Sequence, residues 1–140
     1  MSHFFAARLR KLVFCMTAFL AVAPLTAYAQ SPKTVAENYI KAVANNRVEE
    51  AVGYFSLEDV KKNELTMAKG KIQMVVGMQY ANFEENGGLD SVTATQVEQT
   101  DNMAEITVEM KFKNGETEEE DLTLIKDASG TWKIGIAFGR

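Results

Sequence analysis

The spacing of apolar residues changes once along this chain, at Asn86-Gly87-Gly88, and this change constrains the fold more than any other feature. Before it, apolar side chains recur at the three- and four-residue spacing of helices. After it, they alternate with a period of two, as in half-buried strands. Helices followed by consecutive strands predict an α+β domain in which the helices cover one face of an antiparallel sheet.

The second half predicts about four strands. The clearest covers residues 104–112, where Ala, Ile, Val, Met and Phe alternate with Glu, Thr, Glu and Lys. This alternation places the apolar side chains on one face of the strand and the polar ones on the other. The remaining strands are expected near residues 91–99, 116–126 and 131–138, joined by short polar turns.

The first half predicts helices near residues 32–44 and 46–55 and within 57–83. Ser31, followed by a proline, starts the first. Asn46 and Glu49 form a capping box for the second. Within the third stretch, Gly70 and Gly77 each disfavour helix by about 1 kcal/mol, so we expect a break near Gly70 and two short helices.

The turn at Asn114-Gly115 leaves two strand registers open. A two-residue hairpin loop would place Leu122 opposite Thr107, on the polar face. A three-residue loop, with Gly115 left-handed in a G1 bulge, would place Leu122 opposite Ile106. We favour the bulged register because it keeps the leucine on the apolar face.

The next hairpin presents the same choice at Gly130. With that glycine left-handed, Leu124 lies beside Ile134, and Leu122 lies beside Ile136. The last three strands then share one apolar face.

An acidic run follows Gly115, with five carboxylates in residues 116–121. Side chains of a strand alternate, so Glu118 and Glu120 point one way and Glu119 and Asp121 the other. We expect a solvated strand end with ordinary carboxylates. The alternative concerns Glu120, which faces the apolar side in the bulged register; lining a cavity mouth there would raise its pKa by desolvation.

The N-terminal 29 residues have the pattern of a signal peptide. Three basic residues precede an apolar stretch at 12–22, and a proline precedes the cleavage motif Ala27-Tyr28-Ala29. We expect cleavage after Ala29, a single domain over residues 30–140, and a periplasmic or secreted location. Membrane contact is then limited to the signal peptide before cleavage; a retained anchor is the weaker alternative, because the apolar stretch is short.

Removal of that segment would also remove Cys15 and His3, the chain's single cysteine and histidine. The remainder would lack a thiol nucleophile, a disulfide, a Ser-His pair and a zinc site built on these residues. We therefore expect no metal, no cofactor and no enzymatic activity. Residues 30–140 carry 12 basic and 19 acidic residues, a net charge of −7, which disfavours nucleic-acid binding.

Two stretches carry a family resemblance: SPKTVAENYIKAVANNRVEEAVGYFS from Ser31 and AEITVEMKFKNGETEEEDLTLIKDASGTWKIG from Ala104. They resemble the DUF4878 group of small exported bacterial proteins, in the NTF2-like (cystatin-like, lumazine-binding-related) superfamily. The resemblance implies a cone in which N-terminal helices pack into the concave side of a curved sheet, often around a pocket. It implies no established activity.

Six residues are candidates to line such a pocket: Tyr39, Tyr54, Met74, Met78, Glu120 and Trp132. Each also has a structural interpretation. Buried tyrosines commonly join helices to sheets, and Trp132 is expected to be a core or edge anchor. The methionines, together with Met67, are expected to pack as adaptable core.

The predicted function is a non-catalytic exported module that binds a small apolar ligand or a protein partner. One alternative is an isomerase- or dehydratase-like enzyme with Glu120 as base and Tyr39 or Tyr54 as oxyanion donor. Another is a structural envelope protein that forms a homodimer. Its interface would be the outer sheet face, at Thr107, Lys111 and Thr123.

Overall fold

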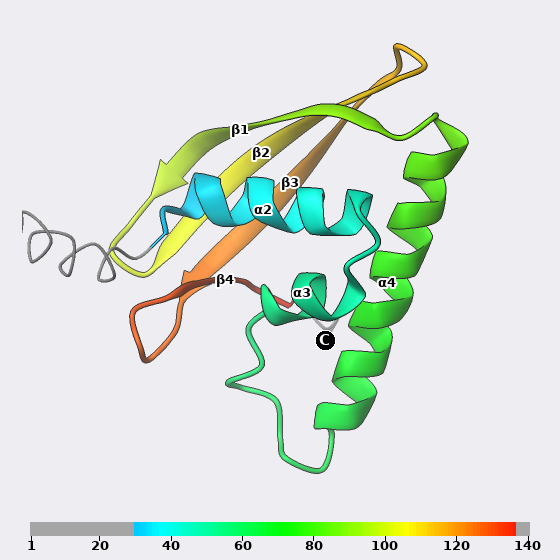
Figure 1. The fold of residues 1–140 in the computed structure, drawn as a ribbon. Coiled ribbons are helices and arrows are strands. Elements are labelled where there is room, and N and C mark those ends of the chain that lie inside the picture. Colours follow the sequence, from blue (N-terminus) through cyan, green and yellow to red (C-terminus); the bar gives the residue numbers. More distant parts are fainter. Residues whose placement is uncertain (1–29, 137–140) are drawn as a thin grey trace, which may run out of the picture.

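The computed structural model describes residues 30–136, which contain three helices and four strands (Figure 1). In chain order they are α2 (Pro32–Ala44), α3 (Val48–Gly53), α4 (Leu65–Glu85), β1 (Leu89–Gln99), β2 (Met103–Phe112), β3 (Thr117–Lys126) and β4 (Trp132–Ile134). The predicted signal peptide lies outside the described residues. None of the helices in residues 30–136 is both long and apolar enough to cross a membrane.

Helix α2 begins and ends where the sequence predicts. The Ser31 side chain accepts a hydrogen bond from the Thr34 amide, and a proline occupies the first turn. At the other end Asn46 is left-handed, with φ of 55°. The Asn46 amide bonds Val43 and the Arg47 amide bonds Ala42, which is the Schellman arrangement.

The predicted capping role of Asn46 is therefore wrong. Arg47 occupies the N-cap of α3 and makes no side-chain capping bond. The physical reason is that asparagine tolerates the left-handed conformation, so Asn46 ends the preceding helix.

Helix α4 is continuous through Gly70 and Gly77, so the expected break near Gly70 is wrong. Four buried side chains recur along one face of the helix: Ala68, Ile72, Val76 and Phe83. Burial of this stripe outweighs the cost of two glycines, about 1 kcal/mol each. Residues 57–64 form turns, so the helix also begins later than predicted.

The four strands form an antiparallel meander in the order β1-β2-β3-β4. The bulged register is confirmed: Ile106 pairs with Leu122, and Gly115 has φ of 89°. The Phe112 amide donates to the Glu116 carbonyl at 2.9 Å, as a three-residue loop requires.

The last hairpin also follows the prediction, with Gly130 at φ 81° and Leu124 paired with Ile134. Strand β4 is shorter than expected and ends at Ile134. The part of the predicted strand at 137–138 lies outside the described residues.

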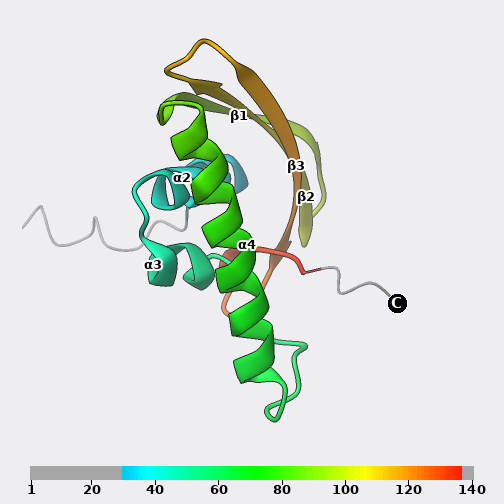
Figure 2. The same cartoon turned by 90° about the vertical axis from the view of Figure 1, so that its right-hand side faces the viewer.

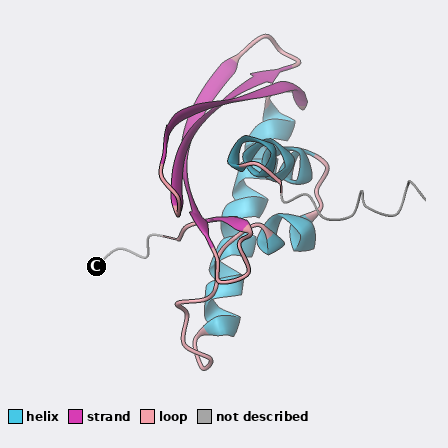
Figure 3. Ribbon diagram, turned by 90° about the vertical axis from the view of Figure 1, so that its left-hand side faces the viewer, coloured by secondary structure: helices cyan, strands magenta, loops and turns pink. Residues whose placement is uncertain are grey.

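The sheet curves around the helices, and α2 lies inside the curve (Figures 2 and 3). Helix α2 contacts β1, β2 and β4, whereas α4 packs on α2 and α3. The core between them contains the Tyr39 ring edge-on to Phe55 at 5.3 Å, and the Phe83 ring 5.2 Å from Phe112. The predicted α+β architecture with helices on one face is confirmed.

Candidate functional site

A cavity of about 590 Å³ lies between α4, the segment after α3, and strands β3 and β4. Its apolar walls come from both layers of the fold. Its lining residues are Tyr39, Phe55, Ser56, Asp59, Val60, Val75, Glu120, Asp121, Leu122, Thr123, Ile125, Ile134, Gly135 and Ile136. This cavity is therefore bordered mainly by aliphatic and aromatic groups, with a smaller number of polar ones.

Three side chains form a polar chain beside this cavity, one from each of α2, α4 and β3. The Tyr39 hydroxyl donates to Gln79 Oε1 at 2.8 Å, and Gln79 Nε2 donates to Glu120 Oε2 at 2.7 Å. The amide of Gln79 is thereby fixed in orientation, since its oxygen faces a donor and its nitrogen faces a carboxylate. These bonds tie both helices to the sheet.

Burial perturbs both ends of this chain. Desolvation raises the pKa of Glu120; the hydrogen bond from Gln79 opposes this rise, and the charge of Glu118 adds to it. Burial, followed by the charge of Glu120, also raises the pKa of Tyr39. The phenol is therefore held in its neutral form, which can donate to Gln79.

The acidic run divides as the alternation of the strand predicts. Glu119 and Asp121 are exposed, and Asp121 accepts a hydrogen bond from the Thr107 hydroxyl at 2.7 Å on the outer face. Glu118 accepts from Asn82 of α4, on the side of the helices. The expectation that all these carboxylates are ordinary is wrong for Glu120, because it is half-buried against the cavity.

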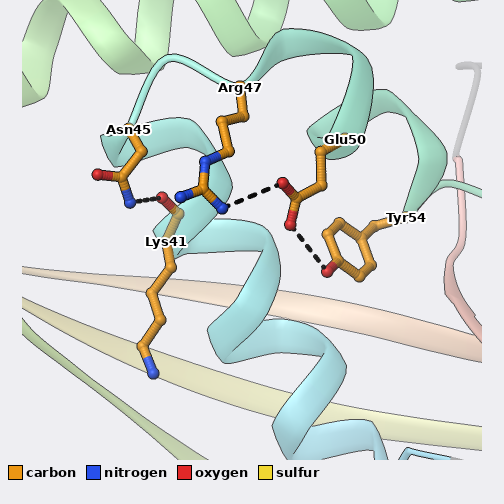
Figure 4. Close-up of polar contacts among 5 residues, drawn as sticks. All are labelled: Lys41, Asn45, Arg47, Glu50 and Tyr54. Carbon is orange, nitrogen blue, oxygen red and sulfur yellow. Dashed lines mark hydrogen bonds and ion pairs between the residues drawn. The ribbon is translucent and has the colours of Figure 1, made fainter.

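Of the six predicted pocket residues, Tyr39 and Glu120 line the cavity and the other four do not. Tyr54 accompanies Glu50 and Arg47 on the surface: its hydroxyl donates to Glu50 at 3.4 Å (Figure 4). Trp132 is buried in the core, as its structural interpretation predicts, and Lys126 Nζ lies 5.1 Å from its ring centre.

The three predicted methionines of α4 do not pack in the core. Met67, Met74 and Met78 are 63–68% exposed, so that expectation is wrong. The core-facing positions of α4 are taken instead by smaller and aromatic residues, which leaves the methionines on the other faces of the helix. Their neighbour Val75, 55% exposed, is the residue of α4 that reaches the cavity.

Sequence reasoning did not identify Gln79, Phe55, Val75 or Ile136 as site residues. A glutamine in the middle of a polar helix face carries no local signal, because its role depends on Tyr39 and a strand 41 residues further on. Phe55 could have been identified from the sequence, because a large aromatic side chain tends to be buried, and it packs against Tyr39.

No group of three or more acidic side chains within the described part of the chain has the arrangement needed to hold a metal ion. The carboxylates that border the cavity are Glu120 and Asp121, consecutive residues of β3 that point to opposite faces of the strand, and Asp59 of the segment after α3. Chemically, the cavity is suited to surround an apolar body and to accept hydrogen bonds from it at a few points.

The fold is that of the NTF2-like class, an α+β cone with helices on the concave side of a curved sheet. It matches the crystal structure of a Campylobacter jejuni protein named "putative NTF2-like transpeptidase", with a TM-score of 0.70 and 22% sequence identity over 76% of this chain and 99% of that one. At this identity the likeness shows the fold alone.

The model of DUF4878, a domain of unknown function, matches residues 25–135, so this chain belongs to the DUF4878 family. No curated protein matches the chain. The resemblance seen in the sequence is thereby confirmed. Membership of this family assigns no function.

Proposed function

We propose that this protein is a non-catalytic exported module that binds a small apolar molecule in the cavity between α4 and the β3–β4 edge. The observation that carries the proposal is the cavity itself. Its volume of about 590 Å³ lies within the range of ligand sites, roughly 300–1,000 Å³. Its walls are mainly aliphatic and aromatic, with isolated polar groups, as in such sites.

The polar chain suggests which ligands fit best. The Tyr39 hydroxyl donates to Gln79 Oε1, and Gln79 Nε2 donates to Glu120 Oε2, which leaves Oε1 of Glu120 as an acceptor. A preferred ligand is therefore an apolar molecule that carries one hydroxyl or amine donor. An acidic ligand is disfavoured by the charge of this carboxylate.

The same bonds argue against catalysis. An oxyanion donor must be free to aim its hydrogen at the substrate, whereas the Tyr39 hydroxyl already donates to Gln79. Tyr54 is not part of the cavity. The isomerase- or dehydratase-like alternative keeps one favourable observation, the raised pKa of Glu120 beside Tyr39, and it requires release of the Gln79 bond.

The name of the Campylobacter protein suggests acyl transfer as another hypothesis. The aliphatic hydroxyls that line this cavity are those of Ser56 and Thr123. Among residues 30–136, no hydrogen bond joins either hydroxyl to a side chain that acts as a general base. The proposal of ligand binding is favoured because it needs no such partner.

Two variants of α4 test the proposal. Val75→Lys places a charged side chain at the cavity mouth, whereas Met74→Lys makes the same change at a neighbouring residue that does not line it. Both positions are more than half exposed, so neither change should unfold the domain. The probe is N-phenyl-1-naphthylamine, a neutral apolar fluorophore with one N–H donor.

We expect the parent and Met74→Lys chains to bind this probe alike, and Val75→Lys to bind it about tenfold more weakly or worse, a loss near 1.4 kcal/mol. Equal binding by all three chains would place the probe elsewhere. Absence of saturable binding by the parent chain would contradict the proposed function.

A homodimer through Thr107, Lys111 and Thr123 stays a prediction. Thr107 already bonds Asp121 within the outer face, which is polar for an obligate contact. Sedimentation of the chain from Gln30 to Arg140 distinguishes monomer from dimer.

A further inference from the structure

A second hollow, of about 340 Å³, adjoins the cavity at the first turns of α4. The chain segment 57–64 runs beside this end of the helix (Figures 1 and 2). The residues that line the hollow are Asp59, Val60, Glu64, Met67, Ala68 and Lys71. Asp59 and Val60 line the cavity as well, so the two spaces meet at these residues. We call the cavity and the second hollow together the groove.

Helix α4 sets the length of the groove. Gln79 donates a hydrogen bond to Glu120 at one end, and Val75, Lys71 and Met67 follow at steps of four residues toward the start of the helix. Because four residues make slightly more than one turn, these positions follow one gently winding line along the helix surface. At 1.5 Å per residue, the levels of Gln79 and Met67 are about 18 Å apart.

Apolar side chains border the groove in both of its parts. Val75 and Leu122 line the cavity, Val60 is half-buried where the two spaces meet, and Met67 lines the second hollow. Met67 is 63% exposed, so a ligand that covers it would remove further apolar surface from water. A methionine side chain also adapts its shape to what it contacts. A compact ligand would fill the cavity and leave this second surface uncovered.

The charged groups that border the groove are mostly acidic. Glu120 and Asp121 border the cavity, Glu64 borders the second hollow, and Asp59 borders both. Among the described residues that line either space, Lys71 is the one basic residue. Carboxylates accept hydrogen bonds from a hydroxyl or an amine and repel an acidic group. The charge of the groove therefore favours a ligand without an acidic head group.

We propose that the ligand is a single-chain amphiphile, with a hydroxyl or amine head at Glu120 and an unbranched alkyl chain that passes Val60 and ends at Met67. The chain accounts for the second hollow, which a compact ligand leaves unfilled, and the head group uses the acceptor that the polar chain leaves at Glu120. This inference rests on the proposed function, because it names the class of ligand for the same cavity.

Two alcohols of different chain length test the proposal, with the chain from Gln30 to Arg140. Hexanol is much shorter than the groove, whereas dodecanol approaches its length. Each is added below its solubility limit, and its affinity is measured by displacement of N-phenyl-1-naphthylamine. Each fully buried methylene strengthens binding about fourfold, so we expect dodecanol to bind about a hundredfold more tightly than hexanol, or tighter still.

Two variants of α4 show whether the alkyl chain reaches the second hollow. Met67→Glu places a charge in that hollow, whereas Met74, in the described part of the chain, borders neither space, so Met74→Glu is the matched control. Both methionines are more than 60% exposed, and glutamate is a good helix former, so both variants should fold.

We expect Met67→Glu to weaken dodecanol binding about tenfold, because a charge replaces an apolar contact, and to leave hexanol and N-phenyl-1-naphthylamine binding unchanged. Met74→Glu should change none of the three affinities. Equal dodecanol binding by Met67→Glu and Met74→Glu would overturn the proposal, while normal binding of N-phenyl-1-naphthylamine would leave the proposed function in place. If the parent chain binds none of these molecules, both the proposed function and this inference fail.

Dodecanoate tests the head group, since it has the chain length of dodecanol and an acidic end. At pH 7 we expect it to bind the parent chain about tenfold more weakly than dodecanol, or weaker still, because of the carboxylates that border the groove. Dodecanoate that binds as tightly as dodecanol, or more tightly, would contradict the proposed head group at Glu120.

Discussion

Tyr39, Gln79 and Glu120 connect α2, α4 and β3 through two short hydrogen bonds, and they lie where the apolar core meets the cavity. Tyr39 is 2% exposed, so its hydroxyl has little access to water that could replace Gln79. The three residues therefore join the helices to the sheet, and two of them, Tyr39 and Glu120, also line the cavity. Replacing one of these side chains by an apolar one leaves the neighbouring polar group without its hydrogen-bond partner, which destabilises the fold.

Tyr39→Phe is expected to destabilise the protein by about 1–2 kcal/mol, because Gln79 Oε1 loses its donor in a partly buried setting. Tyr54→Phe is the matched control. The Tyr54 hydroxyl makes a 3.4 Å contact at the surface, so its loss should cost less than about 0.5 kcal/mol. Urea unfolding measures both, and equal losses would refute the assigned role of Tyr39.

Glu120→Gln tests the buried carboxylate through pH. The pKa of Glu120 is raised in the folded state by desolvation, so its ionisation opposes folding. This contribution favours folding below the ordinary pKa of glutamate and is lost as the pH rises through the folded-state pKa. The variant should therefore gain stability relative to the parent as the pH rises from 4 to 7.

Glu119→Gln, on the outer face, removes the same charge and reports the effect of charge number alone. Thermal unfolding across this pH range gives both differences. A Glu120→Gln variant that loses stability relative to the parent with rising pH would have the wrong sign for desolvation.

At the level of the secondary-structure element, α4 is a long helix that contains two glycines. It is stabilised by one face of buried side chains. A Cβ at Gly70 or Gly77 would meet nothing within 4 Å. The glycines therefore have no packing function in the described structure. Gly87, in contrast, ends the helix with φ of 82°.

Gly70→Ala and Gly77→Ala should each stabilise the protein by about 0.5–1 kcal/mol, since alanine loses less backbone freedom on folding and the space is open. Gly87→Ala is the contrasting change and should destabilise by about 1 kcal/mol, because its backbone is left-handed. Chemical denaturation checks all three. Destabilisation by Gly70→Ala would indicate a partner for that face of α4.

Features of the fold that depend on neighbouring residues could be predicted from the sequence, whereas those that depend on distant contacts could not. The sheet register was predictable because Gly115 and Gly130 fix the loops and the alternating leucines allow only one apolar face. The path of α4 was not, since the burial of Ile72 and Val76 that overrides Gly70 depends on helices α2 and α3. Gln79 was missed for the same reason.

At the scale of the whole molecule, the sheet curves around the helices (Figure 2). The predicted Tyr39 and Glu120 both line the cavity between these layers and are connected through Gln79. The two are 81 positions apart in the chain, so their approach follows from the fold. Val75 of α4, residues of β3 and Ile134 of β4 border this cavity, and the hydrogen-bonded chain of Tyr39, Gln79 and Glu120 lies beside it.

Native mass spectrometry of the chain from Gln30 to Arg140, purified gently from its own source, shows whether the cavity holds a ligand. We expect one small apolar molecule per chain, retained also by Met74→Lys and lost from Val75→Lys. A parent chain with the mass of the polypeptide alone, or an added mass that Val75→Lys retains, would contradict binding in the cavity.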